Sequence, residues 1–490
     1  MSKVWDELIQ MQSVRENLSA LRKEIKDPKA AVEIEALVQQ VEELFYGFLR
    51  SEDAKTRKNA ALLLGDLGYE RAVEVLLEGY RRETTLFVRS AYLQALSHMD
   101  VEKYLPLFEG RLAELMEEEP KVEERKHVEE EIRSLRSILN IYQGMERHTF
   151  DMKGKRHQLL LVTNSLHRKL VCSQFPDARV HPLGVLVETA HPEELFSVRT
   201  YRDILFVHGA DTFVPADPKE AAAVLTAWVQ EMCDSCHSRG GTFAFRIECK
   251  SHMSLEERSR FTKRLGAEIE RISKGALVNC PGEYEVELRL IENKEGKFFP
   301  ALKFFTLKDP RFVYRRNAIA SSIHPSLAAL IVELASPYLK ENAQIMDPFC
   351  GVGTMLIERN KAVPAKEMYG TDIFADAIVM GRENAKGCGA RIHFIHRDFF
   401  DFKHGYLFDE IITNMPVRGT KTKEEMDRLY GRFFEKALVH MKPKGILVLY
   451  TNETGFVKKQ LRLNRQYRLL QETLIQNRNG YSLFILEVKG

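Results

Sequence analysis

The chain has 490 residues, of which 44% are hydrophobic and 29% charged, a balance typical of a globular protein with room for about three domains. The longest weakly charged stretch, residues 317–339, is interrupted by His324, Pro325, Glu333 and Pro337, which excludes a membrane span there. The N-terminal segment lacks the apolar core of a signal peptide, and the seven cysteines are scattered, so we expect free thiols and a cytoplasmic location.

Charge is unevenly distributed along the chain. Residues 1–150 hold 22 basic and 29 acidic side chains, a net charge of −7. Residues 151–340 carry a net charge of +4 and residues 341–490 one of +5. An acidic front is thus joined to two mildly basic parts, which is compatible with a nucleic-acid partner for the later parts without establishing one.

Residues 1–148 have the period of amphipathic helices and show no strand-like alternation. Two segments, TRKNAALLLGDLG (56–68) and VRSAYLQALSHMD (88–100), align at a period of 32 with Arg57 over Arg89. Each is followed by a second amphipathic segment, and this pattern resembles HEAT repeats, in which stacked helix pairs bury a shared face. A plain helical bundle is the alternative. We expect the charge-rich stretch 117–136 to be a solvated helix leading out of the domain.

From His157 onward the sequence reads as short strands mixed with helices. GTFAFRIECK (241–250) and YEVELRLIE (284–292) alternate apolar and polar residues, as half-buried strands do. Between them, a capping box at Ser254 and Glu257 begins a helix. The middle third is therefore predicted to be an α+β domain whose strands present a polar, partly basic face.

Residues 316–490 alternate strand and helix, which predicts a parallel sheet covered by helices on both faces. The end differs, because QETLIQNRNGYSLFILEVK (471–489) consists of two strand-like runs joined at Asn479-Gly480. This dipeptide is a hairpin signal, so the last strand should be antiparallel.

The first strand of this region runs into DPFCGVGTMLIE (347–358), where Gly351 and Gly353 permit a sharp turn and close approach of the backbone to a ligand. Alone, such a turn is weak evidence. Asp372, 19 residues beyond Gly353, ends the next strand and could accept hydrogen bonds from ribose hydroxyls. Asp398 ends the third strand, where its carboxylate or the neighbouring backbone could hold an adenine amino group; a loop-capping aspartate is the alternative reading.

A dinucleotide is the natural rival ligand. Pyrophosphate sites favour three glycines and a helix N-terminus free to meet phosphate, whereas this turn carries Asp347 upstream and Phe349 within it. A carboxylate there repels phosphate and suits a cationic ligand. S-adenosylmethionine, with a sulfonium, an ammonium, a ribose and an adenine, fits this pattern.

The fourth strand, DEIITNMPVRG (409–419), stops abruptly at Asn414-Met415-Pro416. Proline ends the ladder, and the Asn414 side-chain oxygen and the Met415 carbonyl could accept the two N–H bonds of a base's exocyclic amine. Catalysis would then rest on orientation and preorganised acceptors, with little demand for a strong base. An edge strand ending in a loop is the plainer alternative.

DPFCGVGT, GTDIFADAI, HRDFFDF and TNMPVRG occur in an order and spacing that resembles the THUMP-domain RNA methyltransferases, which modify guanine N2 in tRNA. The resemblance implies a Rossmann-like methyltransferase domain over residues 316–490 and a ferredoxin-like plus THUMP RNA-binding module over 156–315. It does not cover residues 1–148, where the repeat predicts a HEAT-like domain. The resemblance also implies catalysis by Asn414, Met415 and Pro416. The implied S-adenosylmethionine contacts are Asp347, Phe349, Gly351, Gly353, Thr354, Asp372, Ile373, Asp398 and Phe399.

The resemblance also leaves questions about the substrate. Val417 stands where the family has an aromatic ring that stacks on the extruded base, and Phe399 or Phe400 could substitute for it. Adenine N6, a ribosomal RNA, and a non-catalytic RNA-binding scaffold therefore remain alternatives to guanine N2 of tRNA. Candidate phosphate contacts are Arg246, Lys250, Lys303, Arg311, Arg315 and Arg316.

Two further expectations concern metal and protein partners. Cys233, Cys236 and His237 have a spacing that suggests zinc, but no second cysteine pair completes a site and Cys236 belongs to an apolar helix stripe. We therefore expect no metal. The acidic helical front could recruit a protein partner or extend the RNA footprint, and its net charge makes direct phosphate binding the less favoured of the two.

Overall fold

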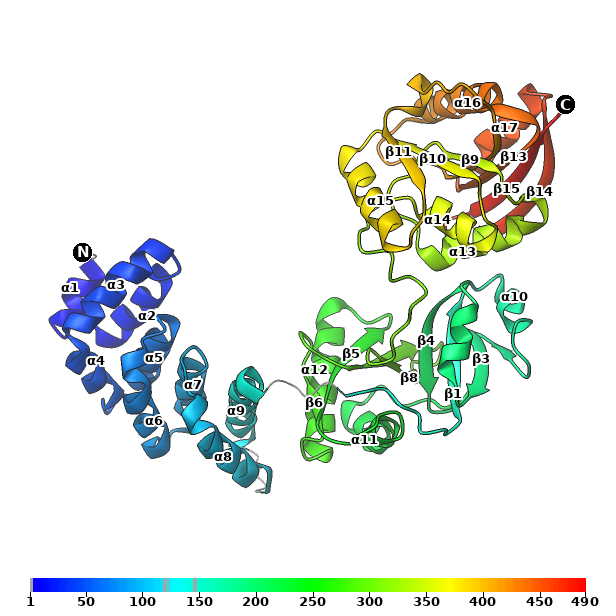
Figure 1. Cartoon of the computed structure of the whole chain (residues 1–490). Helices are drawn as coiled ribbons and strands as arrows, with labels where there is room; N and C mark the ends of the chain where they lie inside the picture. The colour runs from blue at the N-terminus through cyan, green and yellow to red at the C-terminus, as the bar shows by residue number, and fades with distance from the viewer. Residues whose placement is uncertain (1–2, 118–120, 122, 144–147) are drawn as a thin grey trace. The chain divides into compact units, whose positions relative to one another are not determined.

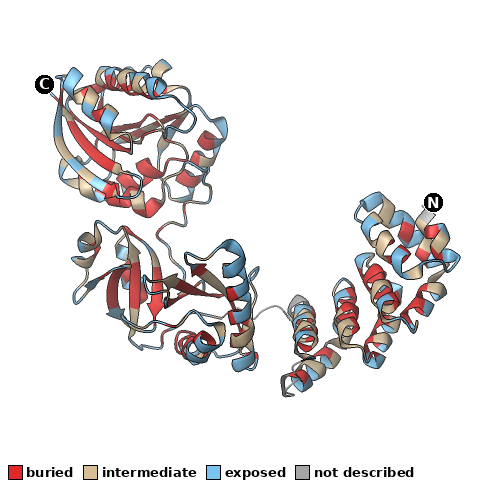
Figure 2. Ribbon diagram, turned by 180° about the vertical axis from the view of Figure 1, so that it is seen from behind, coloured by how far each residue is buried: buried red, intermediate tan, exposed pale blue. Residues whose placement is uncertain are grey.

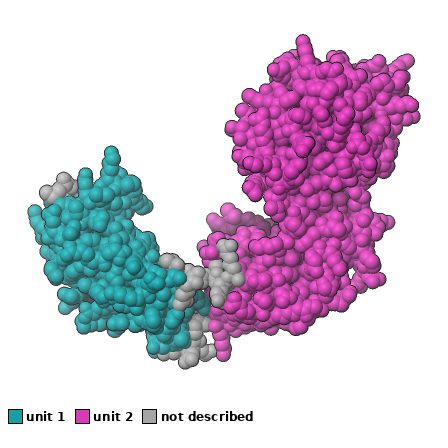
Figure 3. Space-filling model, viewed as in Figure 1, with its two compact units in different colours: residues 1–147 teal, residues 148–490 magenta. Residues whose placement is uncertain are grey.

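The computed structural model describes residues 3–117, 121, 123–143 and 148–490. It separates into two compact units, residues 1–147 and 148–490 (Figures 1 and 3). In the described part of the chain, no helix has both the length and the apolar character needed to cross a bilayer.

The first unit is helical. The two segments that align at a period of 32 fall on α5 and α7, which pack side by side (Figure 1). A Cβ on Gly65 of α5 would lie 2.4 Å from the Cα of Ala95 in α7, so this close packing requires a glycine. The helices are α1 (Lys3–Ile9), α2 (Val14–Glu24), α3 (Pro28–Gln40), α4 (Glu42–Leu49), α5 (Ala54–Asp66), α6 (Val73–Arg82), α7 (Leu86–Leu96), α8 (Leu105–Glu117) and α9 (Arg125–Gln143).

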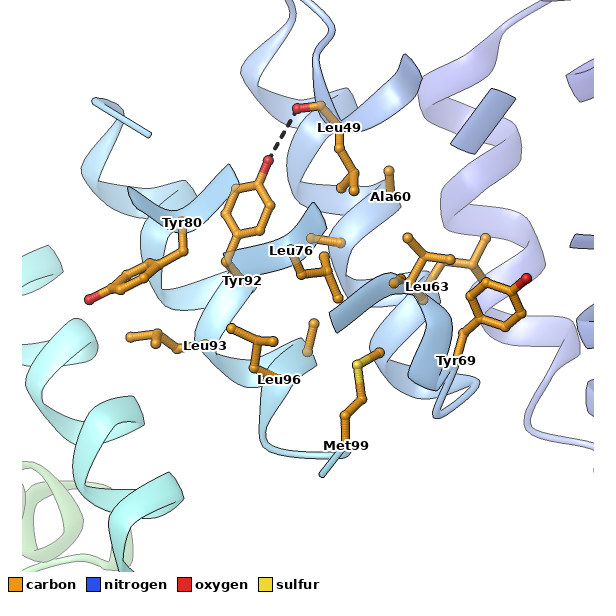
Figure 4. Packing of buried hydrophobic residues seen from close by; sticks show 14 of the residues in the cluster. Leu49, Ala60, Leu63, Tyr69, Leu76, Tyr80, Tyr92, Leu93, Leu96 and Met99 are labelled. Carbon is orange, nitrogen blue, oxygen red and sulfur yellow. Dashed lines mark hydrogen bonds between the residues drawn. The ribbon is translucent and has the colours of Figure 1, made fainter. Parts of the chain in front are cut away.

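One apolar core runs through these helices, and Figure 4 shows part of it, with Leu63, Leu76 and Leu96 packed together. Tyr92 is 1% exposed, and its hydroxyl donates a hydrogen bond to the carbonyl of Leu49 at 3.2 Å, which satisfies the one polar atom that its ring brings into the core. Leucine and tyrosine side chains from successive helices thus bury the shared face expected of stacked helix pairs.

Both aligned arginines form ion pairs. Arg57 binds Glu83 at 2.8 Å, and Arg89 binds Glu131 at 3.1 Å. Glu131 is fully buried in α9, whereas Lys126 and Arg133 are exposed, so this helix is solvated on one face only. The apolar stripe of α9 contributes to the core, and charge density alone concealed it. Residues 118–120 and 122 of the predicted stretch lie outside the described residues.

The second unit contains two sheets, and the first of them has the strand order β2-β3-β1-β4-β8-β7-β5-β6. Helices α11 and α12 pack together, and the capping box predicted at Ser254 and Glu257 is present at the start of α12. Phe243, Phe245 and Cys249 of β5 point into one core, as their alternation predicted. The elements are β1 (His157–Thr163), α10 (Arg168–Cys172), β2 (Arg179–His181), β3 (Gly184–Thr189), β4 (Tyr201–Val207), α11 (Pro218–Ser235), β5 (Phe243–Lys250), α12 (Leu255–Ile272), β6 (Leu277–Asn279), β7 (Val286–Glu292) and β8 (Phe298–Phe304).

The second sheet has the order β11-β10-β9-β12-β13-β15-β14 and is parallel from β11 to β13, while β15 is antiparallel to both of its neighbours. The predicted hairpin at Gly480 joins β14 to β15. This is a Rossmann-like mixed sheet. Its elements are α13 (Pro325–Ala335), β9 (Gln344–Asp347), α14 (Thr354–Ala362), β10 (Glu367–Asp372), α15 (Ala375–Gly387), β11 (Ile392–His396), β12 (Phe408–Asn414), α16 (Lys423–His440), β13 (Met441–Thr451), α17 (Thr454–Leu463), β14 (Tyr467–Gln476) and β15 (Tyr481–Val488).

The inner strands β9, β12 and β15 are mostly buried, as the red strands in Figure 2 show, while the edge strands β11 and β14 are partly exposed. Ile345 and Ile412 pack in one core with α13, α14 and α15, and their neighbours Met346 and Ile411 pack in another with α16 and α17. Consecutive strand residues serve opposite faces, which explains why these strands are continuously apolar.

Candidate active site

Three candidate residues end three neighbouring strands at the same edge of the second sheet. Asp347 is the last residue of β9, Asp372 of β10 and Asn414 of β12. The central strand β9 pairs in parallel with both others, and strand order reverses between β9 and β12. In open α/β sheets, ligands bind in the crevice at such a reversal, beyond the carboxyl ends of the strands.

The turn after β9 depends on its two glycines. Gly351 has φ 51° and Gly353 has φ 80°, backbone angles that residues other than glycine rarely adopt. A Cβ on Gly353 would also lie 2.7 Å from Cζ of Phe394, which leaves no room for a side chain. Thr354 begins α14 directly afterwards, and its buried hydroxyl has no hydrogen-bond partner in the described structure. A buried polar atom without a partner at the start of a helix is suited to a polar ligand group.

Asp372 is fixed by the backbone of this turn. One carboxylate oxygen accepts a hydrogen bond from the Gly351 N–H at 2.9 Å, and the other accepts one from the Phe374 N–H at 2.9 Å. The next two side chains, Ile373 and Phe374, are 60% and 62% exposed. A positioned carboxylate beside two exposed apolar side chains can bind a ribose and the face of a flat ring.

Asp347 lies in the interior, 1% exposed. It accepts hydrogen bonds from the Thr413 hydroxyl at 2.6 Å and from the Phe349 N–H at 3.1 Å. Burial raises the pKa of Asp347 to about 7, and the nearby charge of Asp372 also raises it, while the two hydrogen bonds act in the opposite direction. A buried carboxyl that titrates near neutrality is the kind of group that a cationic ligand would ionise.

Asp398 and Phe399 follow β11, which ends at His396, so the expectation that Asp398 itself ends the third strand is off by two residues. Asp398 caps a short turn by accepting a hydrogen bond from the Phe400 N–H at 2.9 Å. The Phe399 ring is 1% exposed and packs against Phe349 and Phe433, so the suggestion that this ring replaces the missing base-stacking aromatic is corrected. Phe400 is half-buried and has the Arg432 guanidinium 4.0 Å from its ring centroid.

Asn414 stands at the corner where β12 stops. Its side chain forms no hydrogen bond with the residues described, and the next residue, Met415, donates its N–H to the carbonyl of Tyr450 at 3.0 Å. The carbonyl of Met415 accepts no hydrogen bond within the described structure. Pro416 follows and cannot donate, and Val417 is 48% exposed. The corner therefore offers two acceptor oxygens that the fold leaves unused.

Most of the six candidate phosphate contacts are already buried or paired with other side chains of the protein. Arg246 pairs with Glu287 at 2.5 Å, and Lys303 pairs with Asp203 at 2.6 Å. Arg315 is half-buried, with burial lowering its pKa. Lys250 and Arg316 are exposed and form no ion pair with a described residue.

Arg311 requires a correction. Its side chain is 1% exposed, lies over the Tyr201 ring at 3.6 Å and donates to Asp309 and to the backbone carbonyls of Val198 and Tyr201. A guanidinium held in this way is an internal structural group that a phosphate cannot reach.

The residues whose spacing suggested zinc lie in the core beneath the first sheet of the second unit. Cys233 and Cys236 are free thiols 1% and 0% exposed, and the two ring nitrogens of His237 bond the Cys233 carbonyl and the Thr306 hydroxyl. Within the described ranges, no group of three or more His, Cys, Asp or Glu side chains is arranged to hold a metal ion.

Sequence reasoning missed a buried charge network around α14. Glu358 receives Arg199 at 2.8 Å and the Tyr314 hydroxyl at 2.5 Å, while its neighbour Arg359 pairs with Glu410 of β12 at 2.8 Å. Glu358, Arg359 and Glu410 are each at most 1% exposed. The available signal was the placement of charged residues in otherwise apolar segments, MLIER and DEIITN.

Comparison with known proteins agrees with this geometry. A family model described as an RMKL-like methyltransferase domain matches residues 313–476, and a HEAT-repeat model matches residues 18–97 and 41–115. The tRNA (guanine(10)-N2)-dimethyltransferase of Methanothermobacter thermautotrophicus is 25% identical over 155 residues, which cover 30% of this chain and 45% of that protein. The bifunctional methyltransferase of Rickettsia felis is 27% identical over 197 residues, which cover 35% of this chain and 36% of that protein.

The chain thus spans less than half the length of these curated relatives. The crystal structure of TrmN from Thermus thermophilus has a TM-score of 0.50 and 20% identity, and the match covers 68% of this chain and 100% of that one, which shows a shared fold.

The expectation of HEAT repeats at the N-terminus is confirmed by the family match. The match over residues 313–476 includes the glycine turn and the ends of β9, β10 and β12. The C-terminal part of the chain is therefore a class I methyltransferase domain of the RMKL-like kind, and its cofactor is S-adenosylmethionine.

Proposed function

We propose that the protein methylates an exocyclic base amine in RNA, foremost guanine N2 in tRNA, and that it acts in the cytoplasm. The observation that carries the proposal is the corner at Asn414, where a side-chain amide and the Met415 carbonyl stay unbonded beside the glycine turn. The curated relative whose printed name is a tRNA guanine-N2 dimethyltransferase supports the choice of base and RNA.

The residues of the corner supply orientation. The Asn414 side-chain oxygen and the Met415 carbonyl accept the two N–H bonds of the amine and draw its nitrogen toward tetrahedral geometry. Pro416 holds the loop and leaves the carbonyl uncovered. Bound S-adenosylmethionine would supply an activated methyl group to the amine nitrogen, with its sulfur keeping the electron pair of the broken carbon–sulfur bond and one amine proton passing to solvent.

The cofactor contacts are proposed on the same basis. Asp347 and the Thr354 hydroxyl suit the charged methionine end, because one is a buried carboxyl and the other a buried hydroxyl without a partner. Asp372 suits the ribose hydroxyls, and Ile373 suits an adenine face. Gly351 and Gly353 let the backbone approach the cofactor. The remaining proposed contacts are Phe349, Asp398 and Phe399, which would line the cofactor site with their main chain or with packed rings.

We further propose domain boundaries of 1–148, 156–315 and 316–490, with the middle part acting as a ferredoxin-like plus THUMP RNA-binding module. Lys250 of this module and Arg316, the first residue of the methyltransferase domain, are the best phosphate candidates, because both are exposed and form no ion pair with a described residue.

Incubation of the purified protein with labelled S-adenosylmethionine and bulk tRNA, followed by nucleoside analysis, tests the proposal. We expect labelled N2-methylguanosine. Labelled N6-methyladenosine would replace the base assignment, and label in ribosomal RNA alone would replace the RNA. Cofactor binding without any product would identify a scaffold, the reading that the exposed Val417 favours. Asn414→Ala serves as the matched control, because its corner loses an acceptor while the glycine turn stays intact.

A further inference from the structure

A hollow on the first unit gathers positive charge on a part of the chain that is acidic as a whole. Its volume is about 440 Å³, and it is lined by Arg15 of α2, by Lys55, Lys58 and Asn59 of α5, and by Phe87 of α7. No carboxylate is among these lining residues. The three cations and one aromatic ring come from three different helices.

The cations of this hollow are only weakly engaged by the fold. Lys55 and Lys58 form no ion pair with any residue that the structure describes. Arg15 meets its exposed neighbour Glu16 at 3.5 Å. The pKa of the Asp53 carboxyl is lowered by its hydrogen bond from Thr56 and also by the charge of Arg15. The nearby carboxylate of Asp53 caps α5, where it accepts hydrogen bonds from the Thr56 N–H at 2.9 Å and the Thr56 hydroxyl at 2.7 Å.

A second hollow of about 360 Å³, on the α4–α6–α7 side, is lined differently. Its Arg57 pairs with Glu83 at 2.8 Å and its Arg82 pairs with Glu78 at 2.6 Å, while its third cation, Arg50, forms no ion pair with a described residue. The second hollow thus has carboxylates among its lining residues, whereas the first has none. This absence of a lining carboxylate sets the first hollow apart.

The positions of the cations are also unfavourable for helix stability. Arg15 is the second residue of α2 and Lys55 the second residue of α5, so both stand at the positive ends of helix dipoles. Phe87 is the second residue of α7, so three helices begin around the hollow. Positive side chains added to positive helix ends create a local field that an anion would relieve.

The aromatic ring extends what the hollow can bind. Phe87 is half-buried, with the Lys58 ammonium 5.7 Å from its ring centroid and the His127 ring 6.2 Å away. Cations beside an accessible ring form the combination used for single-stranded nucleic acid, in which phosphates meet the charges and a base stacks on the ring.

We infer that this hollow, with Arg15, Lys55, Lys58 and Phe87, is an RNA-binding site that extends the footprint of the substrate onto the HEAT repeats. The inference rests on the proposed RNA substrate, which favours RNA over an acidic protein as the occupant. The net charge of −7 does not prevent binding, because at physiological ionic strength exposed charges are screened beyond about 8 Å and the cations of the hollow dominate locally. This reverses the expectation, drawn from net charge, that the acidic front avoids phosphate.

The test compares two charge-reversed forms of the full chain. The hollow variant combines Arg15→Glu, Lys55→Glu and Lys58→Glu. The control variant, K23E/K26E/K29E, changes net charge by the same amount at three exposed positions of the same unit that form no ion pair with described residues. Binding of bulk tRNA is measured by fluorescence anisotropy over a range of salt concentrations, and thermal melting verifies that both variants fold.

We expect the hollow variant to lose about tenfold in tRNA affinity and to reduce the slope of log affinity against log salt by about 2, with S-adenosylmethionine affinity unchanged. The control variant should retain most of both quantities. Phe87→Ala should weaken binding severalfold without changing the salt slope, because a ring carries no charge.

If both variants lost the same amount of tRNA affinity, the loss would be explained by net charge alone, and the inference would be overturned. Unchanged tRNA binding in the hollow variant would overturn it as well, and would leave an acidic protein as the occupant. Failure of the proposed function looks different, because the wild-type chain itself would then transfer no methyl group to RNA.

Discussion

The titration of Asp347 gives the sharpest quantitative prediction. Burial raises the pKa of this carboxyl to about 7, so at neutral pH about half of the molecules carry it in the neutral form. A cationic cofactor binds the ionised form better. Its binding should therefore weaken as the pH falls through 7, because each bound cofactor must first displace a proton from the carboxyl.

The magnitude follows from the pKa of about 7. If S-adenosylmethionine binds only the ionised form, its Kd should be roughly twofold above the plateau at pH 7, about tenfold above it at pH 6 and about a hundredfold at pH 5. The hydrogen bond from Thr413 and that from the Phe349 N–H favour the ionised form, so these bonds limit the shift.

Isothermal titration calorimetry from pH 5 to pH 7.5 measures this dependence, with Asp347→Asn as the matched control. Asparagine keeps an acceptor oxygen for the Thr413 hydroxyl but cannot ionise, so the variant should bind weakly and with a flat pH profile. The α-amino group of the cofactor, with an ordinary pKa of about 7.7–8.0, gains positive charge as the pH falls, so its titration cannot imitate a loss of affinity on acidification. A wild-type profile as flat as that of the variant would refute the reasoning, since Asp347 would then have no charge contact with the cofactor.

Three further changes separate the roles assigned to the site. Asn414→Ala should lower turnover about a hundredfold in single-turnover kinetics while cofactor affinity stays within about twofold, and equal loss of both would remove Asn414 from its role. Asp372→Ala should weaken cofactor binding at least about tenfold by calorimetry, because it also frees the Gly351 N–H; unchanged affinity would mean that the ribose contact lies elsewhere. Glu410→Gln should lower the free energy of unfolding by about 3–5 kcal/mol in urea denaturation, because it leaves the buried Arg359 without its counter-charge, and a loss below about 1 kcal/mol would contradict this.

The features that sequence reasoning predicted well are short-range ones. The glycine turn, the strand ends at Asp372 and Asn414, and the hairpin at Gly480 are each specified within a few residues, because backbone conformation at glycine and proline is a local property. The parallel sheet followed from the alternation of strands and helices, and its antiparallel last strand followed from the hairpin signal.

The features that it missed depend on partners far away in the sequence. Lys303 pairs with Asp203, 100 residues earlier, and Arg311 is buried under backbone carbonyls 110 and 113 residues away. Composition gives the charge of such residues but not the group that neutralises it. Glu131 was misjudged for the same reason, because an acidic stretch looks solvated until Arg89 and Tyr80 are found around it.

The buried charges on α14 connect this helix, which follows the cofactor turn, to the strand that ends at Asn414. The helix begins at Thr354 beside the cofactor turn, and Arg359 ties it to Glu410, four residues before Asn414 on β12. Glu358, the adjacent residue, receives Arg199, which precedes β4 of the first sheet in this unit.

Methyl transfer requires the amine and the methyl carbon to be placed within about 0.5 Å, a tolerance that packing alone rarely supplies. Glu358 and Arg359 hold α14 to two different parts of the chain. Neither of these side chains can leave its partner without leaving a buried charge unpaired. Burying these ion pairs costs desolvation free energy, and in return they fix the position of α14. Arg359 thus ties α14, which follows the cofactor turn, to the strand that ends at Asn414, and Glu358 ties the same helix to the segment that precedes β4.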